Sequence, residues 1–448
     1  MADTSRVSGS PTTPDKRPMV RAVVASAVGT SIEWYDFFLY GFAATTIFAD
    51  LYFPGNDPST GLLLSLGTYF GGFAARPIGA AIFGHYGDRI GRKATLIITL
   101  LCMGVATTAV GLVPTYDQIG IWGGIILTVL RLMQGIAVGG EWGGSVLLST
   151  EWGKRVGGYR GLLGSWPQFG VPVGLVLGYT ALKVCQPIDP YWGWRIPFLL
   201  SIVLVGVGLY IRLGILETPV FSAVLRDNRV ERIPVLEVIT RNWREIILSA
   251  LLRTGQQAPF YIFTVFVLSY ATDTLGFESD QVYTFVIIGA LVSMVTVPFW
   301  GYMSDRVGRK RIYVAGAVAM LLWSYPYFAL LDTRSTGLVM LAIVLAWPIH
   351  DMQYGPQATF IAESFTGRLR YSGASLGYQL ASLTAGGPAP LIAVWLLDTY
   401  ESSAMIAAYM ALCALVSIVA ALLLKERSHQ DYGSEYDEQE VPAQKAPA

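Results

Sequence analysis

The stretch Gly84-His-Tyr-Gly-Asp88-Arg89-Ile-Gly91-Arg92-Lys93 returns later in the chain as Gly301-Tyr-Met-Ser-Asp305-Arg306-Val-Gly308-Arg309-Lys310. The shared pattern is G-x-x-x-D-R-x-G-R-K, and the two copies begin 217 residues apart. A charged decapeptide that recurs at this distance indicates an internal duplication, with one copy in each half of the chain. We therefore expect two similar halves that carry the same charged turn at equivalent places.

The sequence around both copies is strongly apolar. Of the 448 residues, 53% are hydrophobic and only 14% are charged, and the mean hydropathy is +0.49. About a dozen apolar stretches have the ~20 residues that a helix needs to cross a bilayer, and lipid excludes open strands because their backbone groups would stay unpaired. We predict spans at residues 22–50, 61–84, 94–113, 120–148, 161–183, 196–215, 246–271, 281–303, 312–331, 337–361, 372–397 and 404–424.

The basic residues are concentrated on alternate connections between these spans. The even-numbered connections hold Arg89, Arg92 and Lys93, then Lys154, Arg155 and Arg160, then Arg226, Arg229, Arg232, Arg241 and Arg244, then Arg306, Arg309, Lys310 and Arg311, and finally Arg368 and Arg370. The odd-numbered connections hold Arg334 and, at their edges, Lys183 and Arg195. Because basic connections stay in the cytoplasm, this pattern predicts that both termini are cytoplasmic.

The longest polar interval divides the spans into six and six. The fold class that we predict is an all-α membrane protein with 12 transmembrane helices in two pseudo-symmetric six-helix lobes. The expected parts are a polar tail at residues 1–20, a first lobe at 21–216, a cytoplasmic central loop at 217–245, a second lobe at 246–424 and a tail at 425–448.

Several classes of function are disfavoured by what the sequence lacks. The formal net charge is zero, which gives no argument for nucleic-acid binding. No HExxH, P-loop or metal-ligand spacing occurs, and the three cysteines lie far apart, so we expect no metal, no cofactor and no enzymatic activity. Gly373-Ala-Ser375-Leu-Gly377 matches a serine-hydrolase pattern, but it lies in a predicted membrane helix rather than on a strand-to-helix turn. Because no ATP-binding motif occurs, a membrane protein of this kind that moved a solute uphill would have to take its energy from an ion gradient.

The duplicated turn is a candidate gate. Its Asp lies near a helix end and its basic residues follow within a glycine turn, so that the charges can hold neighbouring helices together in one state. The gating residues that we predict here are Gly84, Asp88, Arg89, Gly91, Arg92 and Lys93 in the first copy, and Asp305, Arg306, Gly308 and Arg309 in the second. The alternative is that the basic residues only fix topology and the glycines only form a turn, which leaves the two Asp residues unexplained.

The duplicated turn resembles the signature of the major facilitator superfamily, in which two six-helix lobes rock around a central site. The finer motifs are Gly29-Thr-Ser-Ile-Glu33-Trp-Tyr35-Asp36, Arg131-Leu-Met-Gln134-Gly135 with Gly139-Gly140-Glu141, Trp192-Gly-Trp-Arg195 with Glu217-Thr-Pro219, and Tyr371-Ser-Gly-Ala-Ser-Leu-Gly-Tyr378-Gln379. Together they resemble the metabolite:proton symporter family, which includes shikimate, α-ketoglutarate, citrate and proline/betaine carriers. The resemblance covers about residues 20–425 and implies proton-coupled import across a bacterial inner membrane. It also brings Tyr35, Gln134, Tyr378 and Gln379 into the candidate site, and makes Arg76 a recurrent position that we group with the gate.

Charged residues inside the spans are the candidate proton and substrate site, because burying them in lipid costs ~2.5–3.5 kcal/mol each unless they are paired or hydrated. Glu33 and Asp36 lie three residues apart on one helix face, and two such carboxylates can bind and release a proton near neutral pH. Arg131 is the expected counter-charge, which protonation would free for a substrate carboxylate. The alternative is a static ion pair that holds spans one and four together. Glu141 stays open between a structural pair and a role in coupling.

The second half offers further polar residues. Arg253 and Gln257 begin span seven, and His350-Asp351 follows Trp347-Pro348 in span ten, where we expect a substrate contact or a proton relay. The alternative is that His350 and Asp351 pair with Arg253. Gly386-Gly387-Pro388-Ala-Pro390 should interrupt span eleven.

The predicted partners are a small-molecule substrate, protons and the lipid bilayer. Arg131 and Arg253 inside the predicted spans favour a substrate that bears a carboxylate, and one two-lobed chain suffices as a monomer. A facilitator, or an exporter, on the same fold is the main alternative to a symporter. A sensor built on a transporter scaffold is a second alternative, although the short acidic tail offers no signalling domain or coiled coil.

Overall fold

The computed structural model describes residues 17–55, 58–151, 159–185, 188–189, 191–214, 234–367 and 369–428. The expectations for Glu217-Thr-Pro219, for Lys154, Arg155, Arg226, Arg229, Arg232 and Arg368, and for the outer parts of both tails lie outside these residues. The helices of the first half are α1 (Arg17–Thr46), α2 (Phe48–Tyr52), α3 (Pro58–Ile90), α4 (Arg92–Val110), α5 (Tyr116–Ile119), α6 (Trp122–Thr150), α7 (Arg160–Cys185) and α8 (Arg195–Leu213).

The second half begins with a short helix that precedes its first long one. Its elements are α10 (Pro234–Arg241), α11 (Trp243–Tyr261), π-helix η2 (Ile262–Phe266), α12 (Val267–Ser269), π-helix η3 (Tyr270–Thr274), α13 (Ser279–Val307), α14 (Arg309–Leu331), α15 (Thr336–Ala362), α16 (Arg370–Ala381), π-helix η4 (Ser382–Gly386), α17 (Pro388–Tyr400) and α18 (Ser403–Leu423). Every predicted span coincides with a long helix or with a helix continued through a π-helical turn, which confirms the all-α fold.

Nine helical segments of the described chain are long and apolar enough to cross a membrane, as judged by length and composition. The other three predicted spans are α1, α3 and the continuous segment from α11 to η3. These are the spans that carry Glu33, Asp36, Arg76 and Arg253, all of which are buried. Their low hydropathy thus reflects polar side chains in the interior of the bundle rather than exposure to water.

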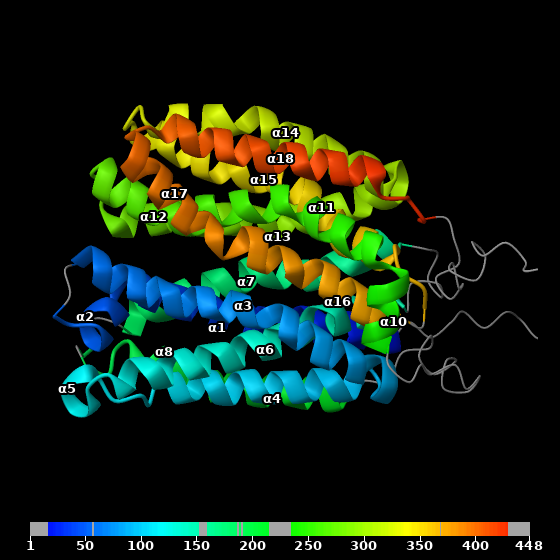
Figure 1. Cartoon of the computed structure of the whole chain (residues 1–448), viewed down its shortest axis with the longest axis horizontal. Helices are drawn as coiled ribbons and strands as arrows, with labels where there is room; N and C mark the ends of the chain where they lie inside the picture. Colours follow the sequence, from blue (N-terminus) through cyan, green and yellow to red (C-terminus); the bar gives the residue numbers. More distant parts are fainter. Residues whose placement is uncertain are drawn as a thin grey trace, which may run out of the picture.

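The helices run along the long axis of the molecule and form two bundles, which lie one above the other in the view of Figure 1. In the first bundle α1 packs against α7, and α6 packs against α3 and α4. In the second, α14 packs against α15 and α18, and α11 packs against α18. The most extensive contacts between the bundles join α13 to α7 and α3 to α16, which are equivalent pairs under the duplication.

Both copies of the repeated motif lie at one end of the bundle, which we call the motif end, and the start of α1 and the end of α18 lie at this end as well (Figure 1). Gly91 and Gly308, which both occupy the second glycine position of the shared pattern, have φ of 107° and 111°. A residue with a side chain rarely adopts such a conformation, so these positions favour glycine. The two copies therefore share their backbone geometry as well as their sequence.

The predicted interruption of span eleven is confirmed. The helix changes from α16 to η4 at Ser382, and Pro388 then occupies the first turn of α17. Proline has no N–H group and its ring displaces the carbonyl four residues earlier, so the regular hydrogen-bond ladder cannot pass through this point. Two further π-helices, η2 and η3, follow Pro259 in span seven and were not predicted.

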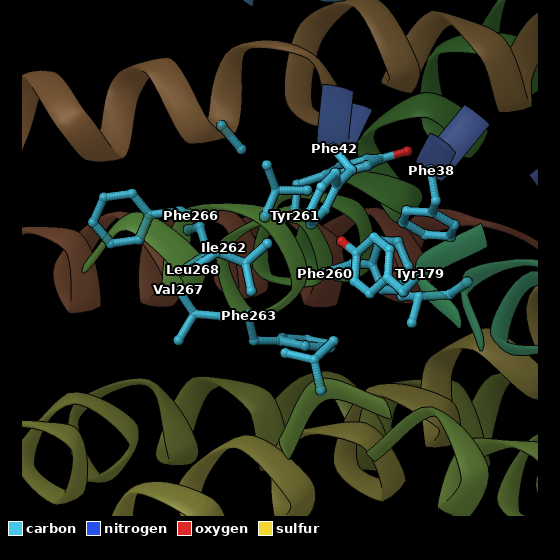
Figure 2. Packing of buried hydrophobic residues seen from close by; sticks show 14 of the residues in the cluster. Phe38, Phe42, Tyr179, Phe260, Tyr261, Ile262, Phe263, Phe266, Val267 and Leu268 are labelled. Carbon is cyan, nitrogen blue, oxygen red and sulfur yellow. The ribbon is translucent and has the colours of Figure 1, made fainter. Parts of the chain in front are cut away.

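Aromatic side chains from both bundles pack against one another where the two bundles meet. Phe38, Phe42 and Tyr179 of the first bundle face Phe260 and Tyr261 of the second (Figure 2). The ring centroids of Phe38 and Phe260 are 6.3 Å apart, a separation typical of interacting aromatic pairs. The two lobes therefore meet through a continuous apolar core.

Candidate functional site

A small cavity in the first lobe gathers charged residues from three helices. It is lined by Glu33 and Asp36 of α1, Arg76 of α3, and Arg131 and Gln134 of α6. None of the five is more than 4% exposed. The volume of about 10 Å³ is roughly the room that one water molecule needs. The structure thus brings together the carboxylates and arginines that the sequence singled out in this half.

Arg131 does not form the ion pair that the sequence suggested. Its Nη1 donates to Gln134 Oε1 at 3.0 Å, while Nε and Nη2 have no hydrogen-bond partner. The guanidinium carbon lies 4.3–4.9 Å from the ring centroids of Phe37, Tyr40 and Tyr69. A guanidinium is weakly hydrated and is attracted to aromatic faces, so rings replace the expected carboxylate. Two of the three guanidinium nitrogens therefore donate no hydrogen bond.

Asp36 is held by hydroxyl groups instead. Thr107 of α4 donates to Oδ2 at 2.9 Å, and Ser201 of α8 donates to Oδ1 at 2.7 Å. The same Thr107 hydroxyl accepts from Gln134, which continues the chain of hydrogen bonds to Arg131. Thr107 and Ser201 could not be selected from the sequence, because a single hydroxyl in an apolar span carries no distinctive pattern.

Arg76 is also held by aromatic rings. Its guanidinium carbon lies 4.6 Å from the centroids of both Phe37 and Phe73. Glu33 has one carboxylate oxygen, Oε2, without a hydrogen-bond partner, and it lines the same cavity as Arg76. Arg76, which we grouped with the gate, therefore lines the charged cavity together with Glu33 and Asp36.

Glu141 forms a buried ion pair with Arg212 of α8, a residue that sequence analysis did not select. Thr99 donates to the other carboxylate oxygen at 2.9 Å, and Ser145 donates at 3.0 Å to the oxygen that Arg212 contacts. Arg212 stands in the last turn of its span, where basic residues usually mark the membrane surface, and this position concealed its role. Glu141 therefore has the buried partner that the structural alternative requires.

Tyr35 does not face the cavity. Its hydroxyl donates to the carbonyl of Pro197 in α8 at 2.8 Å, and its backbone packs where Gly174 of α7 leaves room. The glycines of α6 that surround Glu141 are likewise close-packing positions, since a Cβ on Gly139 would collide with the backbone of α3 and one on Gly143 with Ser375 of α16.

In the second lobe Arg253 belongs to a stack that crosses between the lobes. Its guanidinium carbon lies 3.2 Å from the ring centroid of Tyr378, and the Tyr378 ring stacks on Trp142 of α6 with centroids 3.5 Å apart. Arg253 Nη1 also donates to Ser382 Oγ at 2.9 Å, and Gln257 donates to the same hydroxyl at 3.2 Å. Trp142 was missed, because nothing in the sequence distinguishes it from a packing residue.

Gln379 links the same two lobes, since its amide donates to the carbonyl of Val138 in α6 at 3.4 Å. The position therefore lies at the boundary between the lobes.

His350 and Asp351 pair with each other and not with Arg253. The Nδ1 of His350 lies 2.8 Å from Asp351 Oδ1, and its Nε2 lies 2.6 Å from the amide nitrogen of Gln256. Thr296 of α13 donates to the second oxygen of Asp351. The imidazole is stacked beside Phe260, which faces the first lobe. The alternative pairing with Arg253 is therefore wrong.

At the motif end each repeated Asp accepts hydrogen bonds from the first turn of a helix in the opposite lobe. Asp88 accepts from the backbone N–H and the hydroxyl of Ser372 in α16, at 3.0 and 2.8 Å. Asp305 accepts from the backbone N–H groups of Gly161 and Leu162 in α7, at 2.8 and 2.9 Å. A helix N-terminus carries unpaired N–H groups and a partial positive charge, which suits a carboxylate.

The basic residues of the motif divide into three groups. Lys93 donates to the carbonyl of Leu213, and Lys310 donates to those of Leu422 and Leu424, so each lysine holds the end of the last helix of its own lobe. Arg309 pairs with Asp305 at 2.7 Å and with Glu363 at 3.4 Å, and Glu363 also pairs with Arg160 of the first lobe. Arg89 and Arg306 are exposed, and the side chain of Arg92 lies outside what the structure describes.

The comparisons with known proteins agree with this architecture. The family profile of the Major Facilitator Superfamily matches residues 26–382 and 257–446. The inner membrane metabolite transport protein YhjE of Escherichia coli is 36% identical over 420 residues, which are 92% of this chain and 95% of that protein. The shikimate transporter of Escherichia coli is 38% identical over 418 residues, 91% of this chain and 94% of the transporter.

Among solved structures, the proton:xylose symporter XylE bound to 6-bromo-6-deoxy-D-glucose superposes with a TM-score of 0.73 over 92% of this chain and 97% of that chain, at 16% identity. This likeness concerns the fold. The chain is therefore a multi-pass membrane transporter of metabolites, not an enzyme, and belongs to the Major Facilitator Superfamily.

Proposed function

We propose that the protein imports a small, polar, carboxylate-bearing metabolite together with protons, by rocking of the two lobes around the residues described above. The observation that carries the proposal is Arg131, a buried cation with two guanidinium nitrogens that donate no hydrogen bond, in the same cavity as Glu33 and Asp36. A buried cation with unspent donors is costly unless an anion arrives to use them. A substrate carboxylate supplies that anion, and the carboxylates of the cavity supply a place for the proton.

The coupling follows from charge balance within the cavity. When Glu33 or Asp36 is ionised, its field competes with a substrate anion for Arg131 and Arg76. Protonation removes this competition, so the loaded carrier holds substrate and proton together. The aromatic rings around both arginines exclude water and strengthen these interactions.

Unpaired amide oxygens in the second lobe favour a hydroxylated substrate. Gln256 Oε1 and Gln257 Oε1 are buried and accept no hydrogen bond, and both residues lie beside Arg253 or His350. Such acceptors are satisfied by substrate hydroxyl groups. A shikimate-like hydroxylated acid fits them better than a betaine, which has no O–H or N–H to donate, and the likeness to a shikimate transporter agrees with this assignment. A dicarboxylate would use Arg131 and Arg253 together.

The remaining roles belong to the same proposal. His350 and Asp351 serve as a titratable pair that lines the substrate path. Asp88 and Asp305, with Arg309, act as a reversible latch at the motif end, which is the cytoplasmic end of a monomer in a bacterial inner membrane.

The test is uptake into proteoliposomes under an imposed pH gradient, with hydroxylated cyclic acids, dicarboxylates and betaines as solutes. We expect a hydroxylated acid to concentrate inside, and the variant Asp36→Asn to lose accumulation while it still exchanges labelled substrate at equilibrium. The control Asp117→Asn removes an exposed carboxylate on α5 and should accumulate substrate like the parent.

Two outcomes would contradict the proposal. If substrates equilibrate but never concentrate in the parent protein, the carrier is a facilitator. If Asp36→Asn and Glu33→Gln accumulate substrate as well as the parent does, these carboxylates do not carry the coupling proton.

A further inference from the structure

A polar pocket at the motif end of the second lobe lies apart from the proposed transport path. Three segments of the chain form it: the first turns of α11, Ser364 just after the end of α15, and the residues at and after the end of α18. Its lining residues are Arg244, Glu245, Leu248, Ser364, Leu423, Leu424, Lys425 and Arg427.

The pocket is basic and has the size of a small anion. Among its lining residues, Arg244, Lys425 and Arg427 are basic and Glu245 is acidic. Arg427 is only 9% exposed, and its Nη1 donates to the carbonyl of Ser364 at 3.1 Å, which fixes its guanidinium in the wall. The volume of about 70 Å³ is several times the ~10–15 Å³ that one water molecule needs. A phosphate group, with four oxygens, fits such a space.

The surroundings of the pocket place it at the surface of the bilayer. Leu423 in its wall is 53% exposed and Leu422 beside it is 57% exposed, as expected for the lipid-facing side of the last span. Trp243, adjacent to Arg244, is 58% exposed, and tryptophan is enriched at membrane interfaces. On the neighbouring α10, Leu236 and Ile239 expose an apolar face, and α10 lies at the motif end beside α16 (Figure 1).

We propose that this pocket binds the phosphate of an anionic phospholipid from the leaflet at the motif end. Basic pockets between helices at this depth attract acidic headgroups, because charge attraction and burial of the acyl chains act together. The exposed leucines accommodate the chains, and the three cations accommodate the headgroup. A soluble phosphate compound would meet the same cations but would gain nothing from Trp243, Leu422 or Leu423.

The experiment measures lipid binding to the purified full-length protein by native mass spectrometry. Phosphatidylglycerol and phosphatidylcholine with identical acyl chains are titrated separately. We expect tighter binding of phosphatidylglycerol, with a loss of about fivefold for each cation removed in Arg244→Gln and Lys425→Gln. The control Arg21→Gln removes an exposed cation at the motif end of α1, away from the pocket, and should bind like the parent.

A further variant distinguishes a direct effect on lipid binding from an effect of misfolding. Glu245→Gln removes a carboxylate from the pocket and should raise the affinity for phosphatidylglycerol by about fivefold, a gain that damage to the fold cannot produce. Equal affinity of parent and pocket variants, or an equal loss in Arg21→Gln, would overturn the proposal. Displacement of phosphatidylglycerol by millimolar inorganic phosphate or glycerol phosphate would instead identify a site for soluble anions, and would overturn the assignment to lipid.

Discussion

Single residues in the interior show that buried charges need not be paired with opposite charges. Arg76 and Arg131 lie between aromatic rings, and Asp36 is held by two hydroxyl groups. By contrast, Glu141 and Arg212 form a direct ion pair with two further hydrogen-bond donors. The first arrangement leaves donors available for a ligand, whereas the second uses most of them. This difference separates residues that can exchange partners from residues that hold helices in place.

The position of Gly29 gives a test of the structural pair. A Cβ at Gly29 would collide with the guanidinium of Arg212, so Gly29→Ala should push Arg212 away from Glu141. Breaking a buried ion pair costs ~3–5 kcal/mol, and we expect a clear fall in the thermal unfolding temperature in detergent. In the control Gly206→Ala, on the same helix as Arg212, the added Cβ meets nothing within 4 Å, so stability should stay unchanged or rise slightly. Equal unfolding temperatures for Gly29→Ala and the parent would show that Arg212 has another position open to it.

At the scale of helices, the duplication produces two equivalent contacts across the lobes. Asp88 at the end of α3 caps α16, and Asp305 at the end of α13 caps α7. The motif sequence places each Asp at the end of its own helix, but the partner helix lies in the other lobe and far away in the sequence. Within its own lobe, Asp305 is also paired with Arg309 at 2.7 Å.

These contacts predict how Asp88→Asn and Asp305→Asn behave. Each variant loses the charge that favours the helix N-terminus, a change of ~1–2 kcal/mol that should shift the balance toward a state open at the motif end. The measurement is the labelling rate of Ser375→Cys, a buried position on α16 against α6, in protein without its native cysteines. We expect faster labelling by about fivefold or more for both variants.

Asp305→Asn should also lower the thermal unfolding temperature relative to the parent, since it removes the ion pair with Arg309. The exposed carboxylate variant Asp117→Asn should label like the parent. A shift in only one of the two Asp variants would mean that the two halves of the latch are not equivalent.

At the scale of the whole molecule, the lobes touch at both ends in this conformation. The motif end is closed by the two Asp contacts, and at the opposite end Lys183 of α7 pairs with Asp280 of α13 at 2.6 Å, while Phe42 packs on Tyr283 with centroids 5.0 Å apart. Between them lies the stack of Trp142 on Tyr378. Transport by rocking requires that contacts at one end separate while those at the other remain.

A reversible cross-link tests this requirement. A Cβ on Gly84 would lie 3.5 Å from the Cβ of Ser372, which is within the usual range for a disulfide. After replacement of Cys102, Cys185 and Cys413, the variant Gly84→Cys/Ser372→Cys should lose at least 90% of its uptake on oxidation and recover it on reduction. Each single cysteine variant should be insensitive to oxidant. Unchanged uptake by the fully oxidised double variant would show that transport does not need the motif end to open.

The sequence by itself determined the membrane class, the helical spans, the duplication and the break at Pro388. These features are local or periodic, because hydropathy over some twenty residues, a repeated decapeptide and a proline act within their own segment. It also selected Glu33, Asp36, Arg76 and Arg131, because charge inside an apolar span is conspicuous.

Only the tertiary structure decided which partners those charges have. Thr107, Ser201 and Trp142 come from other helices, and their residue types are unremarkable in a membrane span, so no local pattern could select them. Arg212 lies in the last turn of its span, where a basic residue is usual, so its pairing with Glu141 could not be selected either. The ring cage of Arg131, in place of an ion pair, likewise depends on how α1, α3 and α6 pack. Partner choice is a property of distances between helices, and the order of residues along one helix does not encode those distances directly.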